Sequence, residues 1–320
     1  MRTLVECVPN FSEGRDRGKV EQIAAAIETV PEVYLLDVHL DPDHHRSVIT
    51  FAGSKETVGE AAVRAVGRAA DLIDLNQQEG EHPRIGAADV VPFVPMEGVT
   101  LEDCVAIAHQ AGEKIFRRFQ IPVYFYEAAA LRPERRRLEH VRRAGYERLK
   151  RLVLEDPALQ PDVGEPRLHP TAGATIVGAR PFLIAFNVNL NSSDRKVAQE
   201  IARRVRSSGG GLPGVKAIGL LLKSRRVGGE AGQALLSQGV GGQAQVAMNL
   251  TDFERTSLAV AFHAVEQEAL RLGISIQNSE LVGLIPQKAL AGTSPEALKL
   301  VDFHPGKILE TRLATVLAHR

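Results

Sequence analysis

Apolar and polar positions follow two different periods along this chain. Short apolar runs are typical of strands, and longer stretches with apolar residues three and four positions apart are typical of amphipathic helices. In the first half, apolar runs predict strands at residues 3–11, 33–40, 46–53, 88–95 and 121–128. Because helical patterns separate most of these runs, the sequence predicts an α/β or α+β fold.

The helical stretches of the first half begin at recognisable capping residues. Ser54 can cap a helix, and Thr100 with Asp103 resembles a capping box that starts another. The apolar face expected after Ser54 consists of Val58, Ala61, Ala62, Ala65, Val66, Ala69 and Ile73. The helix after Thr100 is expected to bury Cys104, Ala108, Ile115 and Phe119. The turn formers "DPDHH" separate residues 33–40 from 46–53, which predicts an antiparallel hairpin.

In the second half, strands are expected at residues 182–190, 215–223 and 242–250, with helices near 194–206 and 253–272. One pattern recurs in "CVPNFSEGRDRGKVEQIAAAI", "NVNLNSSDRKVAQEIARRV" and "AMNLTDFERTSLAVAFHAV". Each is a strand that ends in Asn-Phe or Asn-Leu, then polar residues able to cap a helix, then the helix. A turn shared by both halves predicts two similar α/β units, packed with a cleft between them that suits a ligand.

Residues 159–179 fit neither period, since they contain three prolines and three glycines and few apolar residues. We interpret this stretch as the connection between two subdomains, without a regular helix or strand. The predicted subdomains are residues 1–178 and 179–320.

Composition narrows the class of protein. The chain has 39 basic and 39 acidic side chains and 44% apolar residues, which is typical of a globular protein and argues against a dedicated nucleic-acid binder. No apolar run reaches the roughly 20 residues that span a bilayer, and the start lacks a signal peptide, so we expect a cytoplasmic protein. Cys7 and Cys104 form neither a disulfide framework nor a metal-binding pair, and both are expected to pack as small apolar groups.

The segment "RPERRRLEHVRRAGYERLKR", residues 132–151, is locally basic. Its Leu138, Val141, Tyr146 and Leu149 fall roughly at helical spacing, so we interpret the charges as a solvated helix face. No pattern of aromatic and basic residues suited to base stacking accompanies them, which disfavours nucleic acid. Attraction of an anionic small molecule stays open.

His82 is the strongest candidate for chemistry from the residues alone. In "GEHPRIGAADVVPFVP" it stands before Pro83, which favours extended backbone and a defined direction for the ring. A neutral imidazole there can take and return a proton near pH 7, and Glu81 or Arg84 can tune its basicity. The alternative is a loop histidine that only makes structural hydrogen bonds.

The cluster "DVHLDPDHHR", residues 37–46, is the second candidate. Asp37 and His39 would share one face of a strand, and such a set of side chains can hold zinc or manganese. It lacks a recognised ligand spacing, and Asp-Pro-Asp is ordinary turn chemistry, so we favour a site without metal. Phosphate-binding and serine-nucleophile motifs are missing, so no nucleotide is expected.

Several long segments together resemble the glutamate formiminotransferase family. They are "LVECVPNFSEGRD", "LLDV" followed by "RSVITFAG", "GEHPRIGAADVVPFVP", "IPVYFYEAA", "TAGATIVGARPFLIAFNVNL" and "SELVGLIPQKAL". The resemblance runs from residue 4 to about residue 290, and the cyclodeaminase domain that some members carry is absent from the chain.

The resemblance implies a one-carbon transferase of folate metabolism and histidine degradation. The family moves the formimino group from N-formimino-L-glutamate to N5 of tetrahydrofolate, which is a substrate, and no metal or nucleotide is expected. Its fold has two similar α/β-sandwich subdomains of the ferredoxin-like type with a ligand cleft between them. We expect a cytoplasmic homodimer that acts on small molecules and binds neither nucleic acid nor membrane.

The resemblance also implies the site residues. The family's catalytic histidine matches His82, and a supporting position matches His39, where animal members have an aspartate; Asp37 or Asp41 is the alternative source of that charge. The family's folate-contacting stretch matches Gly164, Glu165, Pro166, Arg167, Leu168, His169, Pro170, Thr171, Ala172 and Gly173.

Both substrates carry carboxylates, so arginines are candidate anchors. The candidates are Arg46, Arg84, Arg167 and Arg180, and we favour Arg167 because it lies in the matched stretch. The alternative for each is a surface salt bridge. Three further functions stay open: an enzyme that acts on another N5-substituted folate such as 5-formyltetrahydrofolate, a noncatalytic folate-binding protein and a protein that interacts through its basic patch.

Overall fold

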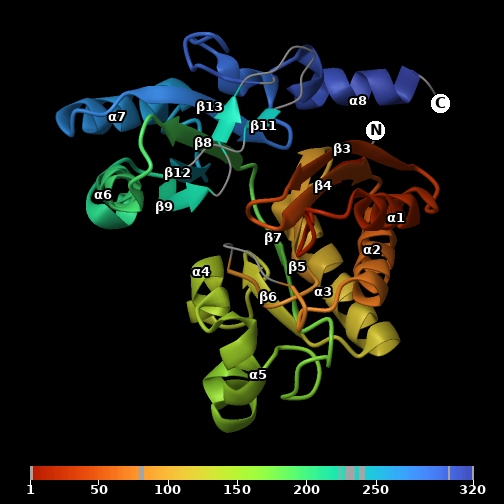
Figure 1. The fold of residues 1–320 in the computed structure, drawn as a ribbon. Coiled ribbons are helices and arrows are strands. Elements are labelled where there is room, and N and C mark those ends of the chain that lie inside the picture. The colour runs from red at the N-terminus through yellow and green to blue at the C-terminus, as the bar shows by residue number, and fades with distance from the viewer. Residues whose placement is uncertain are drawn as a thin grey trace. The chain divides into compact units, whose positions relative to one another are not determined.

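The computed structural model describes residues 3–78, 83–222, 225–227, 235–237, 242–301 and 303–318. Contacts divide the chain into two compact units, residues 1–181 and 182–320 (Figure 1). We call them unit 1 and unit 2 and describe each by itself. The boundary predicted from the sequence follows residue 178.

Unit 1 is built on one seven-stranded sheet. Its strands are β1 (Leu4–Cys7), β2 (Asn10–Phe11), β3 (Val33–Asp41), β4 (Arg46–Gly53), β5 (Ala88–Glu97), β6 (Val123–Glu127) and β7 (Thr175–Ala179). At one edge of the sheet β3 pairs with β4, which also pairs with β1 and β2. Both β1 and β2 pair with β5 on their other side. Next to β5 lies β7, and β6 pairs with β7 at the other edge. The β3–β4 pair is antiparallel, which confirms the predicted hairpin.

Three long helices pack on this sheet, and two short ones follow. The helices are α1 (Arg17–Glu28), α2 (Val58–Leu72), α3 (Leu101–Phe119), α4 (Leu138–Arg142) and α5 (Gly145–Glu155). The apolar face predicted for α2 is buried throughout, and α3 buries three of its four predicted residues fully and Phe119 in part. Cys7 and Cys104 are buried free cysteines, as predicted. The core of unit 1 therefore lies between its sheet and α1, α2 and α3.

The starts of α2 and α3 show one wrong and one correct capping prediction. The hydroxyl of Thr100 accepts the N–H of Asp103, and the carboxylate of Asp103 accepts the N–H of Thr100, which confirms the capping box. Ser54 is not the cap of α2, because a turn at residues 55–57 precedes the helix and Thr57 is its first flanking residue. The N–H of Val58 instead donates to the carbonyl of Ser54 at 3.0 Å.

The prediction that residues 159–179 hold no strand is wrong for β7. This strand lies between β5 and β6, parallel to both, and all five of its residues are buried. A strand buried on both faces shows no alternation of polar and apolar residues. Its small residues, such as Gly178, made the sequence look irregular.

The basic segment contains α4 and α5, and Gly145, the first residue of α5, lies in the left-handed region. Most of its charged side chains are exposed, as predicted for a solvated face. That prediction is wrong for two residues, because the side chains of Arg135 and Arg142 are only 5% and 11% exposed. Both point their charge toward buried aspartates.

Unit 2 has a four-stranded antiparallel sheet in the order β13-β8-β12-β9. Its strands are β8 (Ile184–Leu190), β9 (Val215–Leu222), β12 (Gln243–Leu250) and β13 (Ile276–Val282), beside a two-stranded sheet of β10 (Arg225–Val227) and β11 (Leu235–Ser237). Its helices are α6 (Arg195–Val205), α7 (Leu258–Arg271) and α8 (Leu309–Ala318). α6 and α7 pack on the four-stranded sheet, and the hydrophobic core of unit 2 lies between this sheet and the two helices.

The two units share one arrangement. In unit 2 the order β8-α6-β9-β12-α7-β13 with strand order β13-β8-β12-β9 is the ferredoxin-like βαββαβ pattern. In unit 1, the β1/β2 pair, α1, β3, β4, α2 and β5 repeat it, and α3, β6 and β7 extend the sheet. This confirms the predicted fold of two similar α/β sandwiches.

The recurring strand-to-helix motif forms helix caps. Side chains of Asp16, Asp194 and Ser257 accept a backbone N–H at the starts of α1, α6 and α7. Each thereby satisfies a donor that the helix itself cannot pair. Among the described residues, no helix is both long and apolar enough to cross a bilayer.

Candidate active site

A small pocket in unit 1 gathers polar side chains from four places in the chain. It is lined by Phe11, Ser12, His44, His45, Arg46, Gln78, Arg84 and Asp89. Its volume is about 10 Å³, enough for about one water molecule. These residues come from the turn after β2, the β3–β4 hairpin, the chain on both sides of residues 79–82, and β5.

His82, the predicted catalytic residue, lies outside the described residues. The residues on either side of the undescribed segment, Gln78 and Arg84, are held at the pocket by hydrogen bonds. The side-chain amide of Gln78 donates to the carbonyl of His45 at 3.0 Å, and the guanidinium of Arg84 donates to the carbonyl of Gln78. Arg84 also lies 3.1 Å from the exposed carboxylate of Glu147. The hairpin and α5 therefore hold both flanks of residues 79–82.

The first histidine of the hairpin is held by an aspartate. Nδ1 of His44 lies 2.6 Å from Oδ2 of Asp41, and both side chains are buried. The other oxygen of Asp41 accepts the backbone N–H groups of Asp43 and His44 at 3.1 and 3.0 Å. A carboxylate fixed in this way sets the orientation of the imidazole.

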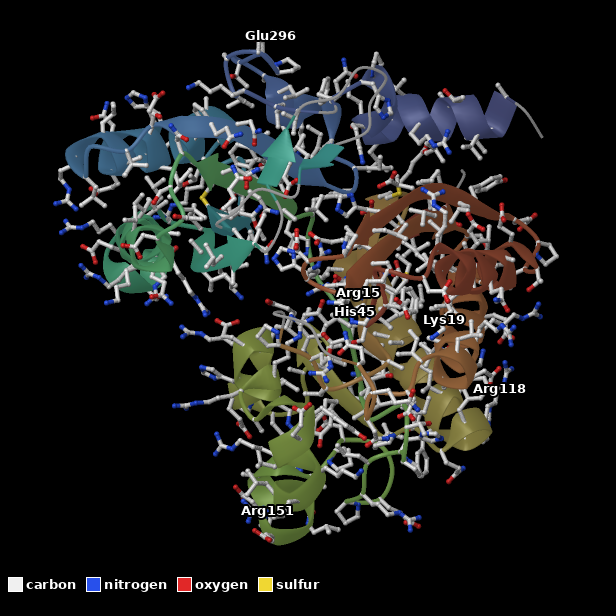
Figure 2. All side chains as sticks on the ribbon, viewed as in Figure 1. Arg15, Lys19, His45, Arg118, Arg151 and Glu296 are labelled. Carbon is white, nitrogen blue, oxygen red and sulfur yellow. The ribbon has the colours of Figure 1, made fainter. Side chains whose placement is uncertain are left out.

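The second histidine of the hairpin is held by a glutamate. Nε2 of His45 lies 3.1 Å from Oε1 of Glu13, and His45 has a φ of +49°, which is rare for a residue other than glycine. Burial alone would raise the pKa of Glu13, but backbone hydrogen bonds from Asp16 and Arg15 and the charges of His45 and Lys19 outweigh burial and lower it. Arg15, Lys19 and His45 are labelled in Figure 2. Glu13 therefore stays ionised beside the imidazole.

An acid and two arginines complete the charged groups near this pocket. Asp89 is 3% exposed, accepts the N–H of Ile85 at 2.8 Å and lies 2.6 Å from Nη2 of Arg142. Arg46 donates to the side-chain carbonyl of Asn10. Burial and the positive charge of Arg142 lower the pKa of Arg46 to about 9, against the opposing effect of Asp89.

The stretch 164–173 packs against the chain that follows residue 82. The N–H of Ala87 donates to the carbonyl of Ala172, and the N–H of Ala174 donates to that of Ile85, both at 2.9 Å. Gly173 has a φ of +71°, and a Cβ there would lie 2.2 Å from the carbonyl oxygen of Ile85. Only glycine allows this close approach without strain. The stretch and residues 85–87 thus form one continuous backbone surface.

Two family models match the chain. Residues 4–180 match the N-terminal subdomain of the formiminotransferase domain, and residues 185–295 match the formiminotransferase domain. The chain belongs to the formiminotransferase family. This confirms the resemblance seen in the sequence, and the two matched regions correspond to the two units.

Full-length relatives are similar along nearly the whole chain. Glutamate formimidoyltransferase of Streptococcus pyogenes serotype M1 is 41% identical over 314 residues, which is 98% of this chain and 99% of that protein. Glutamate formimidoyltransferase of Thermoplasma acidophilum is 42% identical over 97% of each chain. Formimidoyltransferase-cyclodeaminase of Mus musculus is 41% identical over 91% of this chain and 51% of that protein.

Not every residue predicted for this formiminotransferase site lies at the pocket. Arg46 and Arg84 line it, whereas His39 lies in the middle of β3, opposite Val48 of β4, and does not line it. Arg167 is exposed, and its guanidinium lies 3.4 Å from the exposed carboxylate of Glu165. Arg167 thus differs from Arg46 and Arg84, which are only partly exposed.

Three residues at or near this pocket carry no signal of a site in the sequence pattern: Gln78, Asp89 and Arg142. Gln78 and Asp89 carried no motif, and Arg142 was counted among solvated charges. For Asp89 a less direct signal existed, because an acid at the start of a buried apolar run must find a partner. For Gln78 and Arg142 the contacts join residues far apart in the sequence, and spacing does not reveal them.

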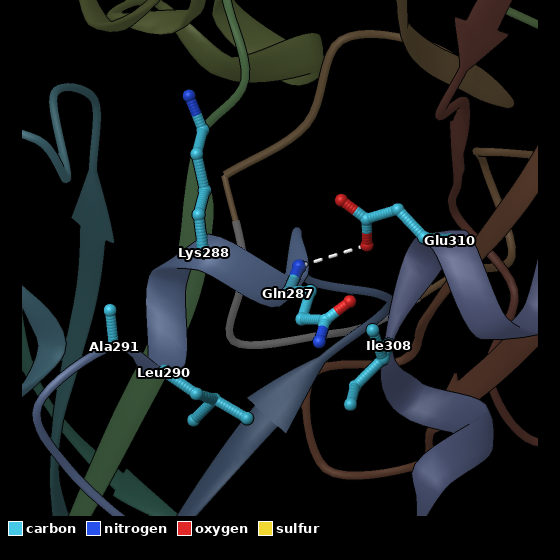
Figure 3. A pocket seen from close by; sticks show the side chains of 6 residues that line it. All are labelled: Gln287, Lys288, Leu290, Ala291, Ile308 and Glu310. Carbon is cyan, nitrogen blue, oxygen red and sulfur yellow. Dashed lines mark hydrogen bonds between the residues drawn. The ribbon is translucent and has the colours of Figure 1, made fainter.

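A second depression lies within unit 2 and has a different character. Gln287, Lys288, Leu290, Ala291, Ile308 and Glu310 line about 730 Å³ of open space (Figure 3). There the backbone N–H of Gln287 donates to the carboxylate of Glu310 at 2.8 Å. None of the residues predicted for the formiminotransferase site lines this depression.

Proposed function

We propose that this chain transfers the formimino group of N-formimino-L-glutamate to N5 of tetrahydrofolate and releases L-glutamate. One observation carries the proposal: two proteins named glutamate formimidoyltransferase are 41% and 42% identical to it over at least 97% of their own length. The charged pocket of unit 1 offers the proton-transfer groups that this reaction needs.

The chemistry requires two proton movements. Attack of N5 on the formimino carbon forms a new C–N bond and a tetrahedral intermediate. N5 must then lose a proton, and the nitrogen of glutamate must gain one before the old C–N bond breaks. An imidazole with a pKa near neutrality can take the first proton and return the second, and we assign this role to His82.

The surroundings of residues 79–82 support this assignment. The flanking Gln78 and Arg84 are fixed beside His44 and His45, each of which lies against a carboxylate. We assign to Asp41, which holds His44, the negative charge that His39 lacks. The proposed folate stretch, residues 164–173, lies along residues 85–87, so a folate held there would lie near the chain that carries His82.

Tetrahydrofolate enters this proposal as a substrate, and no step uses a metal or a nucleotide. A ligand cleft between the subdomains, a homodimer and a cytoplasmic location stay predictions from the family resemblance. Sedimentation of the purified protein at several concentrations tests the dimer.

A direct assay tests the reaction and its donor. Purified protein is incubated with tetrahydrofolate and N-formimino-L-glutamate, and glutamate release is followed; a parallel reaction asks whether 5-formyltetrahydrofolate is consumed when glutamate is the acceptor. We expect turnover with the formimino donor. Turnover only with the formyl compound would replace the proposed donor, and turnover with neither would contradict the proposal.

A further inference from the structure

We propose that Arg46, Arg84 and Arg142 form a carboxylate-binding subsite in unit 1, in which Arg142 helps to select substrates that carry a glutamyl group. The inference rests on the proposed function. It adds a role in substrate binding for Arg142, a residue of the basic segment that has no part in the proton transfers described above.

Two of the three arginines line the pocket together with a buried acid, and the third pairs with that acid. Arg46, Arg84 and Asp89 line the same pocket, and Nη2 of Arg142 lies 2.6 Å from Oδ2 of Asp89. The side chains of Arg84 and Arg142 are 13% and 11% exposed, so bulk water solvates them poorly. They come from the loop before β5 and from the end of α4, which are remote in sequence.

Two of these arginines have donors that the protein does not use. Nε of Arg84 and Nε of Arg142 are buried and have no hydrogen-bond partner in the part of the chain that the structure describes. A buried N–H without an acceptor is costly, and native proteins rarely leave one without a reason. A carboxylate offers several acceptor positions and is the preferred partner of a guanidinium.

The charges favour an anion as well. Among the described residues, Asp89 and the exposed Glu147 pair with Arg142 and Arg84, while Asp41 is engaged by His44. Arg142 and Arg84 therefore each pair with one carboxylate. Burial first, and then the charge of Arg142, lower the pKa of Arg46 to about 9, and a bound anion would relieve the repulsion between these two arginines.

Arg135 shows what a purely structural arginine looks like in the same segment. It pairs with Asp162 at 2.6 Å and donates to the carbonyl groups of Ala158 and Gln160. One ion pair and two backbone carbonyls therefore hold its guanidinium within the fold. Arg142, in contrast, has only the ion pair with Asp89 and no carbonyl partner among the described residues.

The ligand chemistry is a carboxylate, and it has two possible sources: the glutamate part of the donor or the glutamyl tail of the folate. KM values for both substrates are measured in the wild type, Arg142→Gln and the matched control Arg143→Gln, which removes the same charge at an exposed neighbour. Loss of a charged hydrogen bond raises a dissociation constant about 10- to 100-fold. We expect a KM increase of this size in Arg142→Gln, and none in Arg143→Gln.

The arms of the experiment identify the source. A higher KM for N-formimino-L-glutamate alone assigns the subsite to the donor. A higher KM for tetrahydrofolate, but not for tetrahydropteroate, which lacks the glutamyl tail, assigns it to the folate. Unchanged KM values for both substrates in folded Arg142→Gln, or an equal rise in Arg143→Gln, would overturn the proposal.

Two further measurements test the subsite if Arg142→Gln does not fold or if the wild type is inactive. If Arg142→Gln does not fold, Arg142→Lys is measured instead, because it keeps the positive charge but loses the planar guanidinium. We expect its KM to rise several-fold. An unchanged KM in Arg142→Lys would contradict the subsite. If the wild type shows no formimino transfer, the proposed function is wrong. The subsite can then still be tested by calorimetric titration, which measures binding of L-glutamate and of tetrahydrofolate. Binding of either that weakens in Arg142→Gln supports it, and no binding by the wild type contradicts it.

Discussion

Units 1 and 2 share the ferredoxin-like arrangement but place different chemistry on it. Unit 1 gathers histidines, acids and arginines at strand ends and turns, around a small pocket. Unit 2 carries neutral amides and one acid in the middle of its strands, and these bond to each other. The buried members of this amide ladder are Asn187, Asn189, Gln245, Asn278 and Glu280.

The ladder of unit 2 crosses three strands. The amide nitrogen of Gln245 donates to Asn189 at 2.9 Å and to Glu280 at 3.0 Å, and Asn189 donates to Asn278 at 2.7 Å. Side chains that hydrogen-bond to one another across neighbouring strands help to fix the register in which those strands pair. Side chains on turns, such as His44 and His45, can reach a ligand more readily. The comparison teaches that the shared topology fixes the scaffold, while the loops of unit 1 carry the chemistry.

The largest effect on stability is expected from breaking the ladder. Gln245→Ala leaves acceptors of Asn189 and Glu280 without this donor, so the free energy of unfolding should fall by about 2 kcal/mol. Urea denaturation measures it. Gln267→Ala, at an exposed site of α7, is the control. A loss in Gln245→Ala no larger than in the control would show that the ladder does not stabilise unit 2.

The next effect concerns the pair that orients His44. In Asp41→Asn the side chain can still accept the two backbone N–H groups through its oxygen, but its amide cannot accept the proton of Nδ1. The imidazole must change tautomer or turn, and kcat/KM for formimino transfer should fall about tenfold. The exposed Asp71→Asn serves as control. An unchanged kcat/KM and pH profile would remove Asp41 from the site.

A smaller, pH-dependent effect is expected at Glu13. Its pKa in the folded protein is below the ordinary value of 4.5, so its charge stabilises the fold above pH 4.5 and this stabilisation disappears as the pH falls through the lowered pKa. Glu13→Gln should therefore be less stable than the wild type at pH 7, by about 1 kcal/mol, with the difference shrinking below pH 4.5. Thermal melts from pH 3 to 8 measure it, and a difference that grows in acid would contradict the account.

The smallest stability effect is expected at Arg167. Its exposed contact with Glu165 contributes little, so Arg167→Gln should change the free energy of unfolding by less than about 0.5 kcal/mol. If Arg167 also touches folate, as the family resemblance implies, the KM for tetrahydrofolate rises while stability does not. A large loss of stability would show that the contact is structural after all.

Most local signals in the sequence predicted the structure correctly, although Ser54 does not cap α2. The capping box of Thr100 and Asp103, the buried face of α2 and the β3–β4 hairpin depend on residues close together in the chain. Their periodicity and turn chemistry are visible without tertiary context. The recurring strand-to-helix turn likewise predicted two similar units, because its capping residues repeat in both.

Nonlocal features were the ones missed. β7 is a strand because β5 and β6 flank it, and its own residues show no alternation. Arg142 is buried because Asp89, far away in sequence, lies opposite it. The role of His82 stays a prediction, since this residue lies outside the described ones, while Gln78 and Arg84 near it line the pocket.

We propose that the imidazole of His82 moves the protons of formimino transfer. The most direct test is kcat of His82→Ala, measured with tetrahydrofolate binding on the same sample and with His263→Ala, at an exposed site of α7, as control. We predict that kcat falls at least about 100-fold while folate still binds and the control is unaffected. A His82→Ala enzyme that keeps most of its turnover would contradict the claim.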